Sequence, residues 1–176
     1  MLNLFLPKKH VQSIYDITPT MLKDLGIKGV VVDLDNTLVP WNVKEATDEV
    51  RVWLKTLQDA GLYVFVFSNN NEERVRYFAE PLQIPYLARA RKPLKKSFAH
   101  VKKQMNISRG QLAVIGDQLL TDVLGGNRFG AYTILVRPIV ESDAPVTKFN
   151  RQIEKIILNY FYRTGKLTRS VVKDDE

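Results

Sequence analysis

The feature that most constrains the fold is a short apolar run that ends abruptly in two carboxylates. Residues 30–32 are all valine, and Asp33 and Asp35 follow them. Consecutive β-branched residues predict a strand that is buried on both faces, as is typical of parallel sheets. Because ligands bind beyond the carboxyl ends of such strands in open α/β sheets, we expect residues 29–34 to deliver both carboxylates to one pocket.

The rest of the chain alternates between two apolar patterns. Short continuous apolar runs predict further strands over residues 62–67, 85–87, 112–115 and 131–136. Apolar residues recurring every three or four positions predict the intervening helices, over residues 45–60, from 71 to about 81, from 93 to 105, up to 129 and from 149 to 160. This alternation favours an α/β fold with a mostly parallel central sheet in a single domain spanning residues 1–176. Residues 1–28 would form an N-terminal extension, and residues 163–176 a mobile, polar and basic tail.

The composition excludes several kinds of site. With no cysteine and two histidines in 176 residues, disulfides, thiolate metal sites and histidine-rich zinc sites are not expected. No apolar run reaches the length of a membrane span and no signal peptide is recognised, so we expect a cytoplasmic protein. The net charge of +7 suits a phosphate ester, a nucleic acid or an acidic membrane surface, and it equally suits a role in solubility alone.

Polar residues follow three of the predicted strands, and their chemistry suits phosphoryl transfer. A lysine also lies in sequence between the second and third of these strand ends. The candidate site residues are Asp33, Asp35, Ser68, Asn69, Lys92, Asp117 and Asp122. Carboxylates without histidine or cysteine partners favour a hard cation such as Mg²⁺. A hydroxyl with nearby backbone N–H groups can hold phosphate oxygens, and a lysine can neutralise the charge that remains. The sequence therefore predicts a magnesium-assisted phosphate site at one edge of the sheet.

Four motifs in sequence order resemble those of the haloacid dehalogenase (HAD) superfamily of aspartate-based phosphatases. The stretch DLDNT that begins at Asp33 is similar to the first motif, and Ser68 at a strand end is similar to the second. Lys92 resembles the third motif, and residues 116–122, which read GDQLLTD, resemble the fourth. The resemblance implies a HAD-like, Rossmann-like three-layer fold.

The same resemblance implies two catalytic carboxylates and a site for Mg²⁺. Asp33 would be the nucleophile that forms an aspartyl-phosphate. Asp35 would protonate the leaving oxygen and then deprotonate the attacking water. Mg²⁺ would be held by the Asp33 carboxylate, the Asp35 backbone carbonyl and Asp117. Asp122 would either bind the metal through water or orient Lys92.

On the substrate side, the resemblance implies that Ser68, Asn69 and Lys92 hold the phosphoryl group. Residues 39–61 and 70–91, where HAD enzymes often carry inserted cap domains, are too short here for a large cap domain. We therefore expect an open site that suits a large phosphomonoester, such as a phospholipid headgroup or a polymer end.

A closer resemblance is to the YqeG family of subfamily IIIA phosphatases. It is carried by residues 6–7, 15–17, 29–41 and 91–93. Eukaryotic relatives in that family include a mitochondrial phosphatidylglycerophosphate phosphatase, which makes phosphatidylglycerophosphate a candidate substrate. Apolar and basic residues at positions 2–10 fit peripheral contact with an anionic membrane, although packing of residues 2–6 on the core is the favoured interpretation.

Three other functions compete with hydrolysis. A phosphotransferase would use the same aspartyl-phosphate but needs water excluded, which an open site does poorly. A receiver domain also accepts phosphate on an aspartate, but it lacks a carboxylate at the position of Asp35. A non-catalytic protein that binds RNA or the ribosome through its basic surface would interleave aromatic and basic residues, whereas the aromatic residues here lie mostly in apolar runs, so a nucleic-acid partner is not expected.

The two tryptophans are expected to have different surroundings. Trp53 lies on the apolar stripe of the predicted helix 45–60 and should be in the core. Trp41 lies in the loop after the first motif, where it would either wall the pocket or remain a surface residue.

Overall fold

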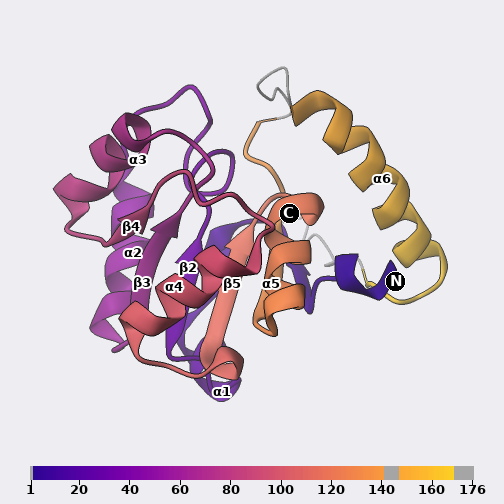
Figure 1. Cartoon of the computed structure of the whole chain (residues 1–176), viewed down its shortest axis with the longest axis horizontal. Coiled ribbons are helices and arrows are strands. Elements are labelled where there is room, and N and C mark those ends of the chain that lie inside the picture. The colour runs from indigo at the N-terminus through magenta and orange to yellow at the C-terminus, as the bar shows by residue number, and fades with distance from the viewer. Residues whose placement is uncertain (1, 141–146, 169–176) are drawn as a thin grey trace, which may run out of the picture.

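A computed structural model of the chain describes residues 2–140 and 147–168 (Figure 1). Within these residues, six strands form one all-parallel sheet in the order β1-β6-β5-β2-β3-β4. The strands are β1 (Lys9–Val11), β2 (Gly29–Val32), β3 (Tyr63–Phe67), β4 (Tyr86–Leu87), β5 (Leu112–Gly116) and β6 (Tyr132–Val136). The α/β class with a parallel sheet, predicted from the alternating patterns, is confirmed.

Helices cover both faces of this sheet (Figure 1). They are α1 (Pro19–Asp24), α2 (Asp48–Asp59), α3 (Glu72–Ala79), α4 (Lys95–Met105), α5 (Leu124–Phe129) and α6 (Thr147–Arg163). Short 3₁₀ turns η1 (Leu2–Phe5), η2 (Ile14–Asp16), η3 (Glu80–Leu82) and η4 (Arg109–Gln111) connect them, and a π-helical turn η5 (Leu119–Val123) leads into α5.

The central strand β2 contributes to two separate cores because strand side chains alternate between faces. Val30 and Val32 pack in the core beneath α2 and α3, whereas Val31 packs with residues of α4 and α5 on the opposite face. All three valines are at most 1% exposed. The valine run is therefore explained by burial of β2 on both sides, and this burial places the end of β2 in the middle of the molecule.

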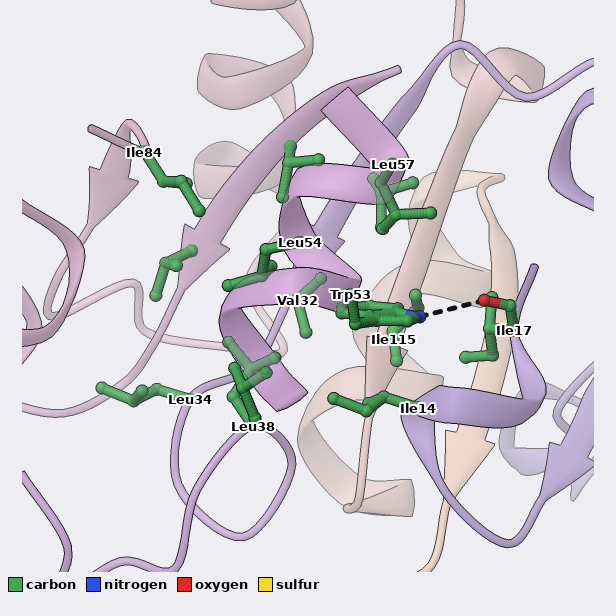
Figure 2. Close-up of a cluster of buried hydrophobic side chains, with 14 of the residues drawn as sticks. Ile14, Ile17, Val32, Leu34, Leu38, Trp53, Leu54, Leu57, Ile84 and Ile115 are labelled. Carbon is green, nitrogen blue, oxygen red and sulfur yellow. Dashed lines mark hydrogen bonds between the residues drawn. The ribbon is translucent and has the colours of Figure 1, made fainter. Parts of the chain in front are cut away.

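Helix α2 packs on the sheet through the predicted apolar stripe (Figure 2). Val50, Trp53, Leu54 and Leu57 are buried, and the Trp53 indole Nε1 donates a hydrogen bond of 3.0 Å to the carbonyl oxygen of Ile17. A buried indole N–H needs such a partner. The core position predicted for Trp53 is confirmed, and its hydrogen bond fastens the N-terminal segment to α2.

The strand predicted at residues 29–34 is present as β2, but it is not the first strand, because an edge strand that was not predicted precedes it. β1 comes earlier and pairs in parallel with β6 at one edge of the sheet. Its sequence, Lys-His-Val, offers no apolar run, and only Val11 is buried, so an edge strand of this kind leaves little pattern. The predicted strand itself is shorter than expected, since β2 ends at Val32 and leaves Asp33 as the first residue beyond it.

Two further boundaries differ from the prediction. Pro93 was predicted in the first turn of a helix, but α4 begins at Lys95 because Pro93 lies within a turn in which the Leu94 N–H donates to the Arg91 carbonyl. The predicted polar tail from residue 163 is also wrong at its start. Arg163 ends α6, and Leu167 is buried; residues 169–176 lie outside the described part of the chain.

The N-terminal segment does not pack fully on the core, contrary to the favoured interpretation. Leu2 and Leu4 are 46% and 39% exposed, while the side-chain amide of Asn127 donates to the carbonyl oxygens of Leu4 and Leu6 and holds η1 against α5. Over residues 2–140 and 147–168, no helix combines the length and the hydropathy needed to cross a bilayer.

Candidate active site

Three neighbouring strands bring the predicted site residues to one edge of the sheet. β2 lies between β3 and β5, and the residues that follow these strands include Asp33, Ser68 and Asp117. The Asp33 N–H donates to the Ile115 carbonyl at 2.9 Å, and the Ser68 N–H donates to the Leu87 carbonyl at 3.0 Å. These bonds continue the sheet pairing past the strand ends and hold the site residues on a rigid frame.

A buried lysine links two of the predicted carboxylates. Lys92 Nζ lies 2.6 Å from Asp33 Oδ1 and 2.7 Å from Asp122 Oδ1. The three side chains are only 2%, 8% and 3% exposed, respectively. Burial alone would lower the pKa of the Lys92 ammonium, but the two carboxylates raise that pKa above its ordinary value. Lys92 therefore stays charged and compensates both anions.

The backbone of Lys92 is held by the loop that follows β3. Asn69 Oδ1 accepts from the Lys92 N–H at 2.7 Å, and Asn69 Nδ2 donates to the Lys92 carbonyl at 3.3 Å. The Ala90 N–H donates to the Ser68 carbonyl, and the Arg89 N–H donates to the Asn70 carbonyl. The predicted substrate residue Asn69 thus contacts the lysine backbone, which explains how a lysine within a basic run is turned inward.

The other basic residues of that run face solvent. Arg89, Arg91, Lys95 and Lys96 are all exposed. Arg89 and Arg91 have φ values of +48° and +55°, a conformation that bulky residues seldom adopt. The strained backbone on either side of Ala90 accompanies the hydrogen bonds that turn Lys92 toward Asp33.

Asp122 approaches the sheet closely because the fourth motif, which it ends, begins with a glycine on β5. A Cβ atom at Gly116 would lie 2.2 Å from Asp122 Cγ, so no side chain fits at that position. Asp122 Oδ2 accepts from the Gln118 N–H at 3.2 Å while Oδ1 contacts Lys92. Of the two roles considered for Asp122, orientation of Lys92 is the one that these contacts favour.

Asp117 is held from two directions. Thr37 Oγ1 donates to Asp117 Oδ1 at 3.1 Å, and the Arg151 guanidinium contacts Asp117 Oδ2 and lies 2.6 Å from the Asp117 carbonyl oxygen. Burial raises the pKa of Asp117 to about 6, although Arg151 opposes the shift. Arg151 also donates to Glu154 at 3.2 Å, so α6 joins this edge of the sheet through an ion-pair network.

Three buried carboxylates form a group that could hold a metal ion. One oxygen from each of Asp33, Asp117 and Asp122 lies within 4.8 Å of the others. An all-oxygen set of this kind fits a hard divalent cation. Burial raises the pKa of Asp33 well above its ordinary value, and Lys92 opposes the shift only in part. In the described part of the chain, Lys92 and Arg151 are the cations paired with these three carboxylates, so a further positive charge would help to keep Asp33 ionised.

The Asp35 side chain lies apart from this carboxylate group. Its Oδ2 accepts from Asn70 Nδ2 at 2.9 Å, and its Oδ1 accepts from Arg74 Nε and Nη2 at 3.2 and 3.0 Å. Asp35 is 21% exposed and therefore more accessible than the buried carboxylates. The prediction gave Asp35 a metal contact only through its backbone carbonyl. The position of its side chain, outside the carboxylate group, is consistent with that prediction.

A cavity of about 200 Å³ opens onto these groups. Its lining comprises Asp33, Asp35, Asn36, Trp41, Ser68, Asn69, Asn70, Lys92, Gln118 and Thr121. Trp41 is 40% exposed and forms part of this wall, and its backbone N–H donates to Asn36 Oδ1. Asn36 itself has a φ of +63°, which marks the tight turn after the two aspartates.

Ser68 combines a capping contact with a place in the cavity wall. It is 2% exposed, and its Oγ accepts from the Asn70 N–H at 3.1 Å. Because a hydroxyl can accept and donate at once, this contact leaves the Ser68 hydrogen available for a ligand oxygen. The turn contact of Ser68 is therefore compatible with the phosphate role that the sequence resemblance implies for it.

Two cations of the site were not singled out in the sequence. Arg74 lies in the first turn of α3, close in sequence to the Ser68 strand end, and this proximity was an available signal. Arg151 lies in α6, whose sequence pattern gives no indication that it reaches Asp117. Thr37, the last residue of the first motif, also received no role of its own from the sequence, but its hydroxyl donates to Asp117.

Comparison with known proteins agrees with this geometry. A family described as mitochondrial PGP phosphatase (PGP, phosphatidylglycerophosphate) matches residues 2–141. The chain is 48% identical over 163 residues to the "Probable phosphatase YqeG" of Bacillus subtilis, covering 93% of this chain and 95% of that protein. It is 26% identical over 181 residues to phosphatidylglycerophosphate phosphatase 1 of Arabidopsis thaliana, covering 96% of this chain but only 52% of that relative.

Solved structures share the fold at lower identity. A cobalt-bound deoxy-D-mannose-octulosonate 8-phosphate phosphatase from Haemophilus influenzae has a TM-score of 0.55 and 21% identity, covering 78% of this chain and 90% of that chain. A HAD subfamily IIIA hydrolase from Legionella pneumophila has a TM-score of 0.51 and 20% identity, covering 81% and 88%. The family match over residues 2–141 and the 48% identity to YqeG show that the chain belongs to the PGP phosphatase family and is a phosphatase of the YqeG type, with the fold of the solved HAD hydrolase.

Proposed function

We propose that the protein is a Mg²⁺-dependent phosphomonoester hydrolase that works through an aspartyl-phosphate on Asp33. The observation that carries this proposal is the position of Asp33 on the cavity wall, with Lys92 Nζ at 2.6 Å and two further carboxylates beside it. A nucleophilic carboxylate with a fixed cation and a cation-binding carboxylate group suits a phosphoryl group better than an uncharged substrate.

In the first step, an Asp33 carboxylate oxygen attacks phosphorus and the ester P–O bond breaks. Asp35 gives a proton to the departing oxygen, while Lys92 and the Ser68 hydroxyl hold the phosphoryl oxygens. In the second step, Asp35 takes a proton from water, whose oxygen attacks phosphorus and releases Asp33. Mg²⁺, held by Asp33, Asp117 and the Asp35 carbonyl, would supply the positive charge that offsets the phosphoryl oxygens.

We propose phosphatidylglycerophosphate as the substrate class, presented at an anionic membrane surface. The family match and the name of the Arabidopsis relative support this choice. Residues 36–91, all described, hold no element besides α2, β3, α3, η3 and β4, which supports an open single-domain site without a cap. Trp41 and Leu94 are exposed. So are the cations Arg89 and Arg91 in the loop before α4, and Lys95 and Lys96 in its first turn. Exposed apolar and basic groups of this kind suit an amphipathic, anionic partner.

The test is Mg²⁺-dependent phosphate release by the wild type and by Asp33→Asn. Substrates are p-nitrophenyl phosphate, glycerol 3-phosphate and phosphatidylglycerophosphate in mixed micelles. We expect Asp33-dependent release from all three, with the lipid turned over fastest, and loss of release with EDTA. Release from the small esters alone would remove the lipid substrate but keep the chemistry. Transfer of phosphate to an added alcohol in preference to water would identify a phosphotransferase.

A further inference from the structure

Asp35 is clamped by two side chains that lie outside the four motifs. Arg74 donates from Nε and Nη2 to Asp35 Oδ1, at 3.2 and 3.0 Å, and Asn70 donates from Nδ2 to Oδ2 at 2.9 Å. Both carboxylate oxygens therefore have a fixed donor. A carboxylate held from both sides keeps one orientation, whereas a free aspartate side chain would sample several rotamers.

The two clamping residues are themselves anchored to the strand end that carries Ser68. The Asn70 N–H donates to Ser68 Oγ, and Asn70 Oδ1 accepts from the Asn71 N–H at 2.8 Å. Asn71 caps α3 by accepting from the Arg74 N–H at 2.9 Å. Ser68, Asn70, Asn71 and Arg74 thus form one connected segment, and its position fixes Asp35 relative to the hydroxyl that faces the phosphoryl group.

The guanidinium of Arg74 directs Nε and Nη2 to Asp35, and its third nitrogen has no hydrogen-bond partner among the described residues. Its side chain is 12% exposed, and its Nη1 atom is buried without a hydrogen-bond partner in the described residues. A buried donor left without a protein partner stabilises nothing by itself. The two hydrogen bonds to Asp35 are therefore the contacts that explain the orientation of this guanidinium.

We propose that Arg74 and Asn70 are positioning residues that hold the Asp35 carboxyl in line for proton transfer to the leaving oxygen. This proposal rests on the proposed function, because it assigns Asp35 the general acid role. Its consequence is a dependence on the leaving group. An alkoxide is a strong base and needs its proton as the P–O bond breaks, whereas p-nitrophenolate leaves without one. The clamp should therefore matter for alkyl phosphates and hardly matter for p-nitrophenyl phosphate.

The experiment measures the single-turnover rate of Asp33 phosphorylation by rapid quench, with glycerol 3-phosphate and with p-nitrophenyl phosphate. Isolating this first step matters because Asp35 also serves the later attack of water, which is common to both substrates. For Arg74→Gln we expect a loss of about 10²-fold with glycerol 3-phosphate and less than about threefold with p-nitrophenyl phosphate. KM for both substrates should stay near the wild-type value.

Matched variants separate positioning from a fault in folding. Arg74→Lys keeps a cation but replaces the two-nitrogen fork by a single donor nitrogen, so it should recover part of the lost rate with glycerol 3-phosphate. Asn70→Ser removes the second donor and should give the same substrate dependence with a smaller loss. Lys55→Gln removes an exposed ion pair with Asp59 on α2 and should leave both rates unchanged.

The outcomes that overturn the proposal are distinct from those that overturn the phosphatase function. Equal losses with both substrates in Arg74→Gln would make the arginine a structural or phosphate-binding residue, and no loss with either would remove it from the reaction. If the wild type forms no Asp33-linked phosphate from either substrate, both the proposed function and this inference fall together.

Discussion

The candidate site has an inner and an outer half, which differ in how far their charged side chains are buried. In the inner half, Lys92, Asp33 and Asp122 are at most 8% exposed and depend on one another for charge compensation. In the outer half, Asp35 and Arg74 are 21% and 12% exposed and pair where water can reach them. Charges buried away from water require a partner for the fold to persist, whereas partly exposed charges are also stabilised by solvent.

This difference matches what the proposed mechanism requires of each half. Phosphoryl transfer is favoured by fixed charges in a water-excluded setting, and the inner half provides such a setting. A residue that gives and takes protons must exchange them with solvent, and the outer half leaves Asp35 accessible for that exchange. The halves should therefore separate experimentally, with stability and activity responding differently to the removal of one charge.

The largest effect is expected for Asp33→Asn. An amide is a poor nucleophile, so steady-state turnover should fall by at least about 10³-fold. The free energy of unfolding should change little, because the variant removes one of several crowded anions and leaves Asp122 to pair with Lys92. Phosphate release and urea unfolding of the same preparation check both statements. Turnover within tenfold of the wild type would show that the nucleophile lies elsewhere.

The next largest effect is a loss of stability in Lys92→Met. This variant leaves Asp33 and Asp122 buried beside Asp117 without their shared cation. Breaking a buried ion pair by removing one partner costs about 3–5 kcal/mol. We expect the metal-free variant to lose that amount in urea unfolding at neutral pH. A change below about 1 kcal/mol would show that the inner half does not rely on charge compensation.

A smaller effect concerns the pH dependence of Mg²⁺ binding. Burial raises the pKa of Asp117 to about 6 in the metal-free protein, so below that pH a proton competes with the metal for this carboxylate. Affinity for Mg²⁺ should therefore be about tenfold weaker at pH 5 than at pH 7 by titration calorimetry. Asp35→Asn, which changes only the outer half, should show the same dependence. Equal affinity at both pH values would remove Asp117 from the ligand set.

The smallest effect is expected for the stability of Arg74→Gln. Its ion pair with Asp35 is partly solvated, so the free energy of unfolding should fall by no more than about 1 kcal/mol. Urea unfolding beside Lys92→Met gives a direct comparison of one cation removed from each half. A loss as large as that of the lysine variant would mean that both halves are needed for the fold and would erase the distinction drawn between them.

Much of the fold and the meeting of the site residues could be predicted because both follow from local patterns. Continuous apolar runs identify strands of a parallel sheet, and strand ends in such a sheet share one edge. Asp33, Ser68 and Asp117 were located in this way. β1 was not predicted because an edge strand with one buried residue has no comparable apolar pattern.

The partners of these residues depend on tertiary packing, which no local pattern records. Arg151 lies on α6, which is far from β5 in sequence. It reaches Asp117 because α6 packs against η5, just beyond the end of β5. Asn69 was expected to contact substrate, but its amide is engaged by the backbone of Lys92, which depends on how two loops meet. Side chains that hold other side chains are thus the part of a site that sequence motifs leave out.

The placement of the two tryptophans gives the molecule a pair of independent optical reporters. Trp53 lies in the core, 7% exposed, with its indole hydrogen-bonded to Ile17, so its emission should be blue-shifted until the chain unfolds. Trp41 lies at the cavity mouth, 40% exposed, so its emission should be red-shifted and open to quenching by acrylamide. A ligand in the cavity should shield Trp41 alone. Occupancy and unfolding can therefore be followed in the unlabelled protein as two separate spectral changes.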